Sequence, residues 1–450
     1  MNEYVSQYYR CPERYLKLSA KEVRAGLEGY FRFGDNIVCY GPYNGTKASY
    51  SPAGSLSDAN CDTVAADGEV SVPFDVERVV DNLRFERYAS AGAAAQVLES
   101  PLNRLYYLVR PLLPVAVRKH LQRIRLSGWD KISFPQWPVD CTVDNLLERL
   151  LLLSLRANRL ECIPFIWFWP NGASSSAIMT HDVETAAGRD FCASLMDIDD
   201  RFGIKAAFQV VPEERYEVTP EYLESITTRG FEVAVQDLNH DGRLYRNRQQ
   251  FLTRAAKINA YGRRWGASGF RAAILYRREE WFDSLDFSYE MSVPNVAHLD
   301  PQRGGCCTVM PYFIGKLLEL PVTTTQDYSL FHILRDHSIG LWEQQIDLIM
   351  EKHGLISMIV HPDYIITRRE RETYEVLLKH LVRIRDEKGV WITTPNEVNR
   401  WWRQRAEMDL VKSGDGWRIE GEGKERARIA YAREERGQLT FSFVSETVSC

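Results

Sequence analysis

The chain has 450 residues, 45% of them hydrophobic, and its 56 Lys and Arg residues against 61 Asp and Glu residues leave a net charge of −5. This length predicts two or three domains with sizeable cores, and the balanced charge argues against a nucleic-acid partner. The start of the chain lacks a basic segment followed by an apolar one, and no apolar run is long enough to span a membrane. The nine cysteines lack Cys-x-x-Cys spacing, which favours reduced thiols in a cytoplasmic protein over a disulfide framework or a structural zinc site.

Residues 1–163 are predicted to form a mostly helical or irregular N-terminal region. A stretch near 41–67 is rich in Gly, Ser, Ala and Asn and poor in large apolar residues, which predicts a flexible surface loop. After Asp75, valines and a leucine recur at three- and four-residue spacing over 76–83, and this spacing predicts an amphipathic helix.

A second helical stretch is expected over 105–125, where Arg and Lys residues lie among Leu, Val and Tyr. This composition suits peripheral contact with an anionic surface at the inner face of a membrane. A helix that docks on its own domain with a solvated basic face explains the same residues more simply. Pro111 and Pro114 also interrupt any long continuous helix.

From residue 164 to 402, short apolar runs alternate with amphipathic segments. The apolar runs predict strands over 176–179, 205–211, 231–235, 269–270, 355–360 and 390–393. The amphipathic segments predict helices over 191–202, 221–228, 251–260, 278–285, 339–351 and 374–385, with an irregular stretch over 289–321. Alternating strands and helices indicate an α/β fold with a parallel sheet or barrel. The tail, 403–450, alternates polar and apolar residues and predicts a small β-rich unit.

Polar side chains follow four of the predicted strands. In chain order these are Asp182 and Glu184, then Gln236, Asp237 and His240, then Arg271, and finally His361 and Asp363. A single Asp or His after a strand is usually a turn former or a surface residue. The loops after parallel strands converge on one face of the sheet, however, and so we expect these side chains to form one reaction site.

At these residues the chain resembles the polysaccharide deacetylase family, carbohydrate esterase family four, over about residues 164–402. The family's Thr-Phe-Asp-Asp-Gly motif is similar to 180–184, its His-Ser/Thr-x-x-His motif to 236–240, its Arg-x-Pro motif to 271–273, its fourth motif to 289–294, and its apolar strand ending in His to 356–362. The resemblance implies a distorted (β/α) barrel of the polysaccharide deacetylase type and hydrolysis of the carbon–nitrogen bond of an N-acetylated amino sugar or glycan.

The resemblance also implies roles for individual residues. Asp182 would be the general base that deprotonates water, Arg271 would keep Asp182 ionised, and His361 would protonate the departing amine. A divalent metal, commonly zinc, would be held by Glu184 and His240 and more weakly by Gln236. The remaining candidates, Tyr276, Asp237 and Asp363, are expected to contact the substrate.

Three departures from the family motifs leave alternatives open. Val183 stands where the family has a metal-binding carboxylate, Gln236 stands where it has a His, and the third motif lacks its Pro. A neutral amide oxygen is a poor zinc ligand. The barrel could therefore serve metal-independent amide hydrolysis, or bind glycans without catalysis in a regulatory protein. A cytoplasmic location would favour soluble or lipid-linked amino sugars, or small amides, as substrates.

Overall fold

The computed structural model of the chain describes residues 2–21, 28–44, 49–90, 124, 126–414 and 416–443. The chain divides into two compact units. Unit 1 combines Met1–Tyr88, Asp140–Ala173 and Arg400–Cys450, and unit 2 combines Ala89–Val139 and Ser174–Asn399. The basic helix expected over 105–125 lies outside the described residues, apart from Ile124.

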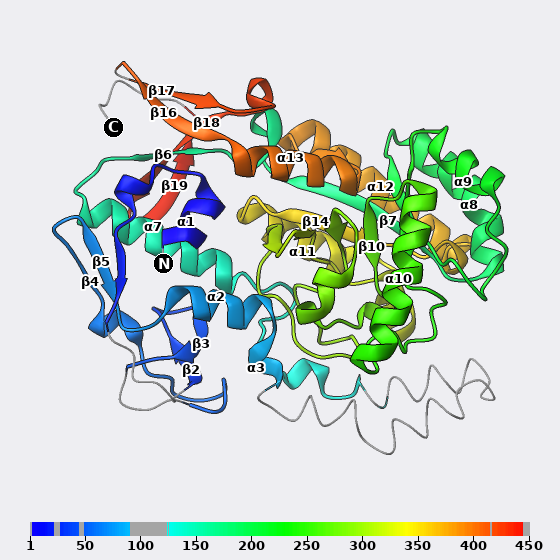
Figure 1. Cartoon of the computed structure of the whole chain (residues 1–450), viewed down its shortest axis with the longest axis horizontal. Coiled ribbons are helices and arrows are strands. Elements are labelled where there is room, and N and C mark those ends of the chain that lie inside the picture. Colours follow the sequence, from blue (N-terminus) through cyan, green and yellow to red (C-terminus); the bar gives the residue numbers. More distant parts are fainter. Residues whose placement is uncertain are drawn as a thin grey trace. The chain divides into compact units, whose positions relative to one another are not determined.

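Unit 2 is built on a curled nine-stranded sheet (Figure 1). Its strands are β7 (Ser176–Val183), β8 (Ala206–Val210), β9 (Glu232–Gln236), β10 (Gly269–Arg271), β11 (Tyr289–Glu290), β12 (Tyr312–Ile314), β13 (Leu317–Glu319), β14 (Leu355–Ile359) and β15 (Trp391–Thr393). Their order is β12-β13-β11-β10-β9-β8-β7-β14, and β15 pairs with β7. All of these pairs are parallel except β12 with β13. The fold is thus mixed α/β, and its parallel strands deliver their carboxyl ends to one side.

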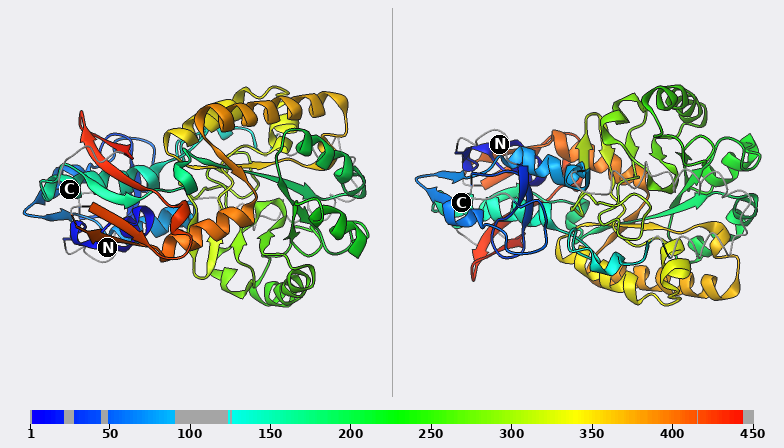
Figure 2. Two further views of the ribbon diagram at one scale, coloured as in Figure 1. Left: turned by 90° about the horizontal axis from the view of Figure 1, so that it is seen from above. Right: turned by 90° about the horizontal axis from the view of Figure 1, so that it is seen from below.

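Helices lie on the outside of these strands (Figure 2). They are α8 (Ala186–Arg201), α9 (Pro220–Thr227), α10 (Arg248–Trp265), α11 (Gly340–Glu351) and α12 (Arg368–Lys388), followed by α13 (Pro395–Glu407). The sequence sets several of their ends by capping. The side chains of Thr185, Thr219 and Asn247 accept hydrogen bonds from the first turns of α8, α9 and α10.

An extended segment links the two sides of the curled sheet. Val322 forms a parallel bridge with Pro294, and the hydroxyls of Thr323 and Thr324 donate to the carbonyl oxygens of Leu355 and Ser357 in β14 at 2.7 and 2.8 Å. These side-chain bonds replace the backbone ladder that a further strand would make. Because the segment runs beside β14, it carries the next residues to the same end of the sheet.

One prediction for this region is confirmed in part and another is wrong. The helix predicted over 278–285 is present, but as a 3₁₀ helix, η7 (Glu279–Ser284). The stretch 289–321, predicted to be irregular, contains β11, β12 and β13. These strands have two or three residues each, and so they are too short to show a clear alternation of apolar and polar residues.

The described part of unit 1 contains four pairs or sheets of short strands and several helices. Its strands are β1 (Leu18–Ala20), β2 (Glu28–Arg32), β3 (Val38–Pro42), β4 (Val64–Ala66), β5 (Glu69–Val72), β6 (Ile163–Ile166), β16 (Asp409–Ser413), β17 (Gly416–Glu420), β18 (Ile429–Glu435) and β19 (Gln438–Ser442). Its helices include α1 (Asn2–Tyr9), α2 (Val76–Arg84) and α7 (Thr142–Ala157), and α3 (Arg87–Ser90) lies at its boundary. The described part of 1–163, predicted to be helical or irregular, thus also contains the strands β1–β5 and the start of β6.

Pairing between distant segments explains why the predicted boundaries at 163 and 402 differ from the two units. Strand β18 pairs antiparallel with both β19 and β6, so the tail shares a sheet with residues 163–166. The fully buried Arg405 adds to this connection, since its guanidinium donates to the carbonyl oxygens of Ile166, Trp167 and Tyr8. Burial lowers the pKa of Arg405 to about 9. The tail and the N-terminal residues therefore form one unit.

Two further expectations for unit 1 need correction. The stretch near 41–67 was expected to be a flexible loop, but its described part holds a 3₁₀ helix at Ala59–Asp62 and β4, which pairs with β5. The Asp58 carboxylate stabilises this turn by accepting from the backbone N–H groups of Asn60 and Gly34. Cys162 is disulfide-bonded, against the expectation of reduced thiols, whereas Cys11 is a buried thiol.

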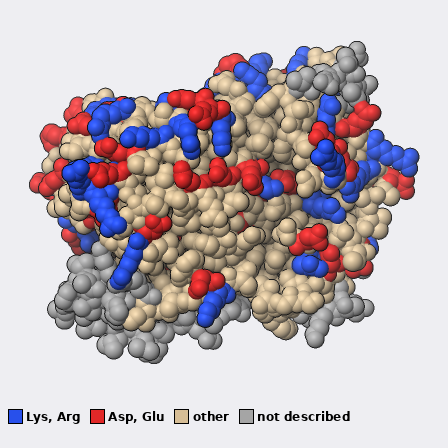
Figure 3. Space-filling model, turned by 180° about the vertical axis from the view of Figure 1, so that it is seen from behind, with Lys and Arg blue, Asp and Glu red and all other residues tan. Residues whose placement is uncertain are grey.

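Acidic and basic side chains are interspersed on the face drawn in Figure 3. Ion pairs also form on the surface of unit 2, where Arg229 lies 2.9 Å from Asp197 and 2.7 Å from Asp200. Such exposed pairs add at most about 1 kcal/mol each to stability. Among the described helices, none combines the length and the apolar character that crossing a membrane requires.

Candidate functional site

A buried ion pair stands at the carboxyl end of β7. The Arg271 guanidinium, which is fully buried, donates from one nitrogen to Asp182 Oδ1 at 2.5 Å and to Thr180 Oγ1 at 2.8 Å. Its Nε donates to the carbonyl oxygen of Met291 at 2.9 Å. Thr180 and Asp182 share one side of β7 because alternate strand residues do so. Arg271 therefore pairs with the Asp182 carboxylate and fixes its direction.

The side chain of Gln236 bridges the carboxylates of Asp182 and Glu184 at the carboxyl end of β7. Its side-chain NH2 group lies 3.1 Å from Asp182 Oδ2 and 3.2 Å from Glu184 Oε1, and it donates to both. Its Oε1 is buried and has no hydrogen-bond partner within the described part of the chain. The amide thus presents its donor, not its acceptor, to the acidic groups.

Two imidazoles flank Glu184. Nε2 of His240 lies 2.7 Å from Glu184 Oε1, a close contact although the N–H is not aligned for a hydrogen bond, and Nε2 of His361 lies 3.4 Å from the same oxygen. Burial acts to raise the pKa of Glu184, but the charges and contacts of His240 and His361 outweigh it and hold that pKa well below its usual range. Glu184 is therefore a carboxylate at neutral pH.

Asp327, which no motif of the sequence singled out, binds the side of the His361 ring that faces away from Glu184. Asp327 is fully buried, and its two carboxylate oxygens accept from Nδ1 and from the backbone N–H of His361, each at 2.7 Å. Burial acts to lower the pKa of His361, but Asp327 and Glu184 raise it well above its usual range. The imidazolium consequently keeps a proton on Nε2, directed at the site.

His240 is held in an uncommon conformation by its loop. Its φ is +54°, and that of Asp237 is +49°, so the loop between them carries two non-glycine residues in the left-handed region. The guanidinium of Arg215 donates to the carbonyl oxygen of His240 at 2.7 Å and to its Nδ1 at 3.2 Å. Because Nδ1 accepts this bond, the neutral ring carries its proton on Nε2, facing Glu184.

The donor chemistry around Glu184 decides whether the site fits a metal. Ligand atoms of Asp182, Glu184 and His361 all lie within 4.8 Å of one another, a grouping that could hold a divalent cation. Gln236, however, turns its NH2 group to the carboxylates, and the nitrogens of His240 and His361 that face Glu184 carry protons. Metal ligands must be deprotonated. As arranged, the residues do not fit the zinc ion expected from the sequence, since hydrogen-bond donors take the ligands' places.

A second buried histidine fixes the backbone behind the site. Nδ1 of His181 lies 3.0 Å from the carbonyl oxygen of Val360, and its Nε2 lies 3.0 Å from the carboxylate of Asp199, which also accepts from the Tyr374 hydroxyl at 2.6 Å. His181, Asp199 and Tyr374 are fully buried. This network ties β7 to the end of β14, and so it sets the spacing between Asp182 and His361.

The three expected substrate contacts occupy different surroundings. Asp237 is fully buried, its carboxylate accepts from the backbone N–H of Leu238 at 2.6 Å, and burial raises its pKa. Asp363 is partly exposed, and burial raises its pKa as well. The ring of Tyr276 lies beside Gly242, where an added Cβ would come within 3.6 Å of it. Asp363 is thus the most accessible of the three.

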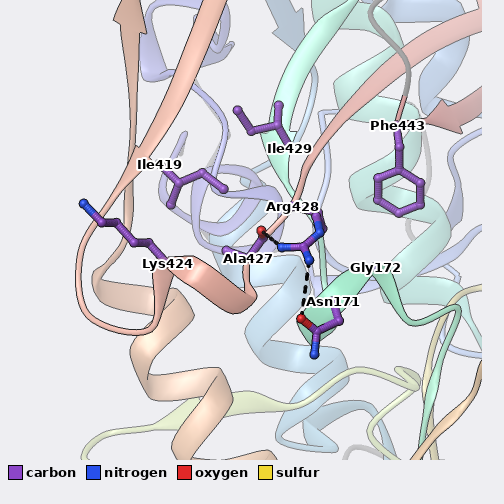
Figure 4. Close-up of a pocket in the computed structure, with 8 residues that line it drawn as sticks. All are labelled: Asn171, Gly172, Ile419, Lys424, Ala427, Arg428, Ile429 and Phe443. Carbon is purple, nitrogen blue, oxygen red and sulfur yellow. Dashed lines mark hydrogen bonds between the residues drawn. The ribbon is translucent and has the colours of Figure 1, made fainter.

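A pocket of about 660 Å³ lies in unit 1 (Figure 4). It is lined by Asn171, Gly172, Ile419, Lys424, Ala427, Arg428, Ile429 and Phe443. The Arg428 guanidinium donates to the carbonyl oxygen of Ala427 at 2.8 Å and lies 3.5 Å from the side-chain oxygen of Asn171. The lining residues include no carboxylate or imidazole that could activate water, and so the residues around Asp182 in unit 2 form the candidate catalytic site.

Comparison with known proteins gives similarities to solved structures alone, since no family model and no curated protein matches the chain. A polysaccharide deacetylase from Mycobacterium smegmatis is 16% identical with a TM-score of 0.44, over 55% of this chain and 96% of that one. A polysaccharide deacetylase from Pseudomonas aeruginosa PAO1 is 12% identical with a TM-score of 0.40, over 51% and 91%. The Puue allantoinase is 11% identical with a TM-score of 0.44, over 52% and 92%.

Proposed function

We propose that unit 2 is a hydrolase of the polysaccharide deacetylase type, which cleaves the amide bond of an N-acetylated amino sugar without a bound metal. The observation that carries this proposal is a matched base and acid. An ionised Asp182 is held by Arg271, and a protonated His361 is held by Asp327. Their facing atoms lie within 4.8 Å of each other, which is a suitable span for the two sides of one amide bond.

The residues divide the reaction between them. Asp182 accepts a proton from a water molecule as the water oxygen adds to the acetyl carbonyl carbon. His361 then donates its Nε2 proton to the amide nitrogen as the carbon–nitrogen bond breaks, and acetate and the free amine leave. Glu184 keeps His361 protonated through its negative charge. General acid and base assistance of this kind is worth about 10²–10⁴-fold each.

The Gln236 amide favours this metal-independent form over a zinc-dependent one. Its NH2 group neutralises part of the charge of Asp182 and Glu184, which is the task that a cation performs in a metal site. A zinc-dependent enzyme would need this amide to turn and His240 to lose its Nε2 proton. Both changes cost free energy, and so metal affinity is expected to be low and to rise with pH.

Acetate release from oligomers of N-acetylglucosamine tests the proposal. The wild-type protein should release acetate and an equal amount of free amine, at the same rate before and after dialysis against a chelator. An activity that disappears on chelation and returns with zinc would contradict the metal-independent form. The absence of acetate release from every such oligomer would contradict the substrate class.

The proposal also covers where the protein acts and whether it contacts a membrane. A cytoplasmic protein would meet amino sugars as soluble precursors or linked to lipid at the inner membrane face. Binding to anionic vesicles that weakens with added salt would support peripheral contact through 105–125. No binding at low salt would contradict it.

A further inference from the structure

The pocket of unit 1 is built around Trp167, which holds three of its sides in place. The backbone N–H of Trp167 donates to the carbonyl oxygen of Arg428 at 2.9 Å, and its indole N–H donates to that of Ala173 at 2.7 Å. The ring of Phe443 packs edge-on against the Trp167 ring, with 4.9 Å between the centroids. Because Trp167 is buried, these contacts anchor the pocket walls to the interior of the unit. The pocket is therefore preformed, as ligand sites usually are.

The guanidinium of Arg428 is held in this pocket with part of its donor capacity unused. Its Nη1 donates to the carbonyl oxygens of Glu425 and Ala427 at 3.0 and 2.8 Å, and its Nη2 lies 3.5 Å from the side-chain oxygen of Asn171 (Figure 4). A guanidinium carries five N–H groups, so two of those on Arg428 bind no residue in the described part of the chain. Arg428 also forms no ion pair with any carboxylate that the structure describes. A cation fixed in this way is pre-organised to bind an anion.

The rest of the pocket wall is largely apolar. Ile419 of β17, Ile429 of β18 and Phe443 after β19 line it, and Phe443 is 47% exposed. At Gly172, where φ is +77°, an added Cβ would lie 3.4 Å from Cζ of Phe443 and 3.7 Å from Cγ of Arg428. The glycine therefore leaves open the space between the aromatic ring and the stem of the cation. A ligand in this space contacts both.

The charge of the lining is positive only. Lys424 and Arg428 are its two charged residues, and none of the eight lining residues carries a carboxylate. The ammonium group of Lys424 is directed away from Arg428 in Figure 4, so it adds positive potential at the rim and not a second contact. The pocket therefore favours a ligand that combines an anionic group with an apolar part.

We propose that this pocket of unit 1 binds a phosphate ester that carries an apolar chain. The phosphate accepts hydrogen bonds from the unused N–H groups of Arg428, and the chain packs on Phe443, Ile419 and Ile429. A phosphate monoester carries close to two negative charges at neutral pH, so it also uses the positive potential of Lys424, which a carboxylate does less. None of these residues belongs to the proposed catalytic site in unit 2. The inference thus goes beyond the proposed function and does not depend on it.

Three small molecules separate the two parts of such a ligand. Octyl phosphate presents both parts, inorganic phosphate lacks the chain, and octyl glucoside replaces the phosphate with a neutral sugar. Calorimetry with the whole chain, at concentrations below those at which the octyl compounds form micelles, measures each affinity. One fully buried CH2 group is worth about fourfold in affinity, and one hydrogen bond to a charged group about 10–100-fold. Octyl phosphate should therefore bind at least about tenfold more tightly than either of the other two molecules.

Two variants remove the two halves of the site separately. Arg428→Gln removes the cation and should weaken the binding of octyl phosphate by about 10–100-fold. Phe443→Ala removes the exposed ring and should take away most of the advantage of octyl phosphate over inorganic phosphate, about tenfold. The matched control is Arg436→Gln, because Arg436 is exposed between β18 and β19 and does not line the pocket. This control should bind octyl phosphate as the wild type does, and urea unfolding checks that each variant is folded.

Each half of the proposal can fail separately. Octyl phosphate that binds no more tightly than octyl glucoside would overturn the anion site, and octyl phosphate that binds no more tightly than inorganic phosphate would overturn the apolar part. Wild-type affinity in folded Arg428→Gln or Phe443→Ala would overturn the assignment to this pocket, and so would an equal loss in Arg436→Gln. If Arg428→Gln does not fold, Phe443→Ala alone decides the assignment.

Discussion

Two pairs of acidic residues at strand ends of the same sheet have opposite surroundings. Asp182 and Glu184 follow β7, where Arg271, Gln236 and the histidines supply positive charge and N–H donors. Glu290 and Glu319 lie side by side at the ends of β11 and β13, and both are fully buried. The first pair is surrounded by groups that stabilise negative charge. The second pair is not.

The pair Glu290 and Glu319 shares hydrogen bonds in place of a cation. Glu319 accepts from the backbone N–H of Val293 at 3.1 Å, Glu290 accepts from that of Ser292 at 2.8 Å, and the two carboxyl groups bond to each other. Burial raises the pKa of Glu319 well above its usual range, and the neighbouring Glu290 raises it further. Burial and the neighbouring carboxyl group therefore favour the protonated form of Glu319.

The difference shows that burial alone does not decide how a carboxyl group behaves. Asp182 is 4% exposed and Glu290 is 0% exposed, so neither is in contact with much water. Asp182 faces a guanidinium, whereas Glu319 faces another carboxyl group. Nearby charge and hydrogen-bond donors thus distinguish an ion-paired carboxylate from a pair of adjacent carboxyl groups within one sheet.

The largest expected effect is on acetate release, when one carboxyl group of each pair is replaced by an amide of the same shape. Asp182→Asn should reduce acetate release by about 10²–10⁴-fold, because the general base is lost while the shape is kept. Glu319→Gln makes the same kind of change in the other pair and should leave acetate release within about twofold of wild type. Full activity of Asp182→Asn would show that Asp182 is not the general base.

The second effect is on stability. Arg271→Met would leave the Asp182 carboxylate buried without its cation, and breaking a buried ion pair in this way costs about 3–5 kcal/mol. Urea unfolding of the variant measures this loss. The double variant Arg271→Met with Asp182→Asn should recover part of it, and a single variant as stable as wild type would mean that Asp182 needs no cation.

Both residues of the first pair, Asp182 and Glu184, were predicted from the sequence, whereas neither Glu290 nor Glu319 was singled out. Asp182, Gln236, Arg271 and His361 each follow an apolar strand, and the structure brings all four together. Asp327 was missed because the segment before it meets β14 through threonine hydroxyls, a contact with no periodic signature in the sequence.

Other features were hidden by short or distant pairing. Glu290 and Glu319 lie on strands of two and three residues, too short for an alternating pattern. The tail joins unit 1 because β18 pairs with β6, and these two strands lie roughly 260 residues apart in the chain. The sequence indicated strands in the tail, but their partner depends on tertiary packing that no local pattern records.

The third effect is a pH dependence that only the second pair should show. The pKa of Glu319 is raised above its ordinary value of 4.5, so its stabilising contribution is complete below that pH and is lost as the pH rises through the higher folded value. Wild-type stability should fall over this range by at most about 1.4 kcal/mol per pH unit for this proton. Urea unfolding of Glu319→Gln at several pH values should give a flatter curve, and an identical curve would contradict the shared proton.

The smallest expected effect concerns metal binding at the first pair. Gln236→His removes the NH2 group between Asp182 and Glu184 and adds an imidazole, a much better zinc ligand than an amide. Zinc affinity measured by calorimetry should rise by about tenfold or more, because a change of one residue around a bound metal typically changes its affinity by about 10–100-fold. Gln236→Asn, which keeps an amide, is the matched control, and equal zinc affinity in both variants would contradict the role given to the NH2 group.

The central claim is that the protein's own donors keep Asp182 and Glu184 ionised while Glu290 and Glu319 hold a proton. Infrared spectroscopy at neutral pH tests it directly, because a protonated carboxyl group has a carbonyl stretch distinct from the bands of a carboxylate. We predict that wild-type protein shows this stretch from a buried group, that Glu319→Gln removes it, and that Asp182→Asn and Glu184→Gln leave it unchanged. A band that disappears in Asp182→Asn or Glu184→Gln instead would show a protonated carboxyl group at the site and contradict the account.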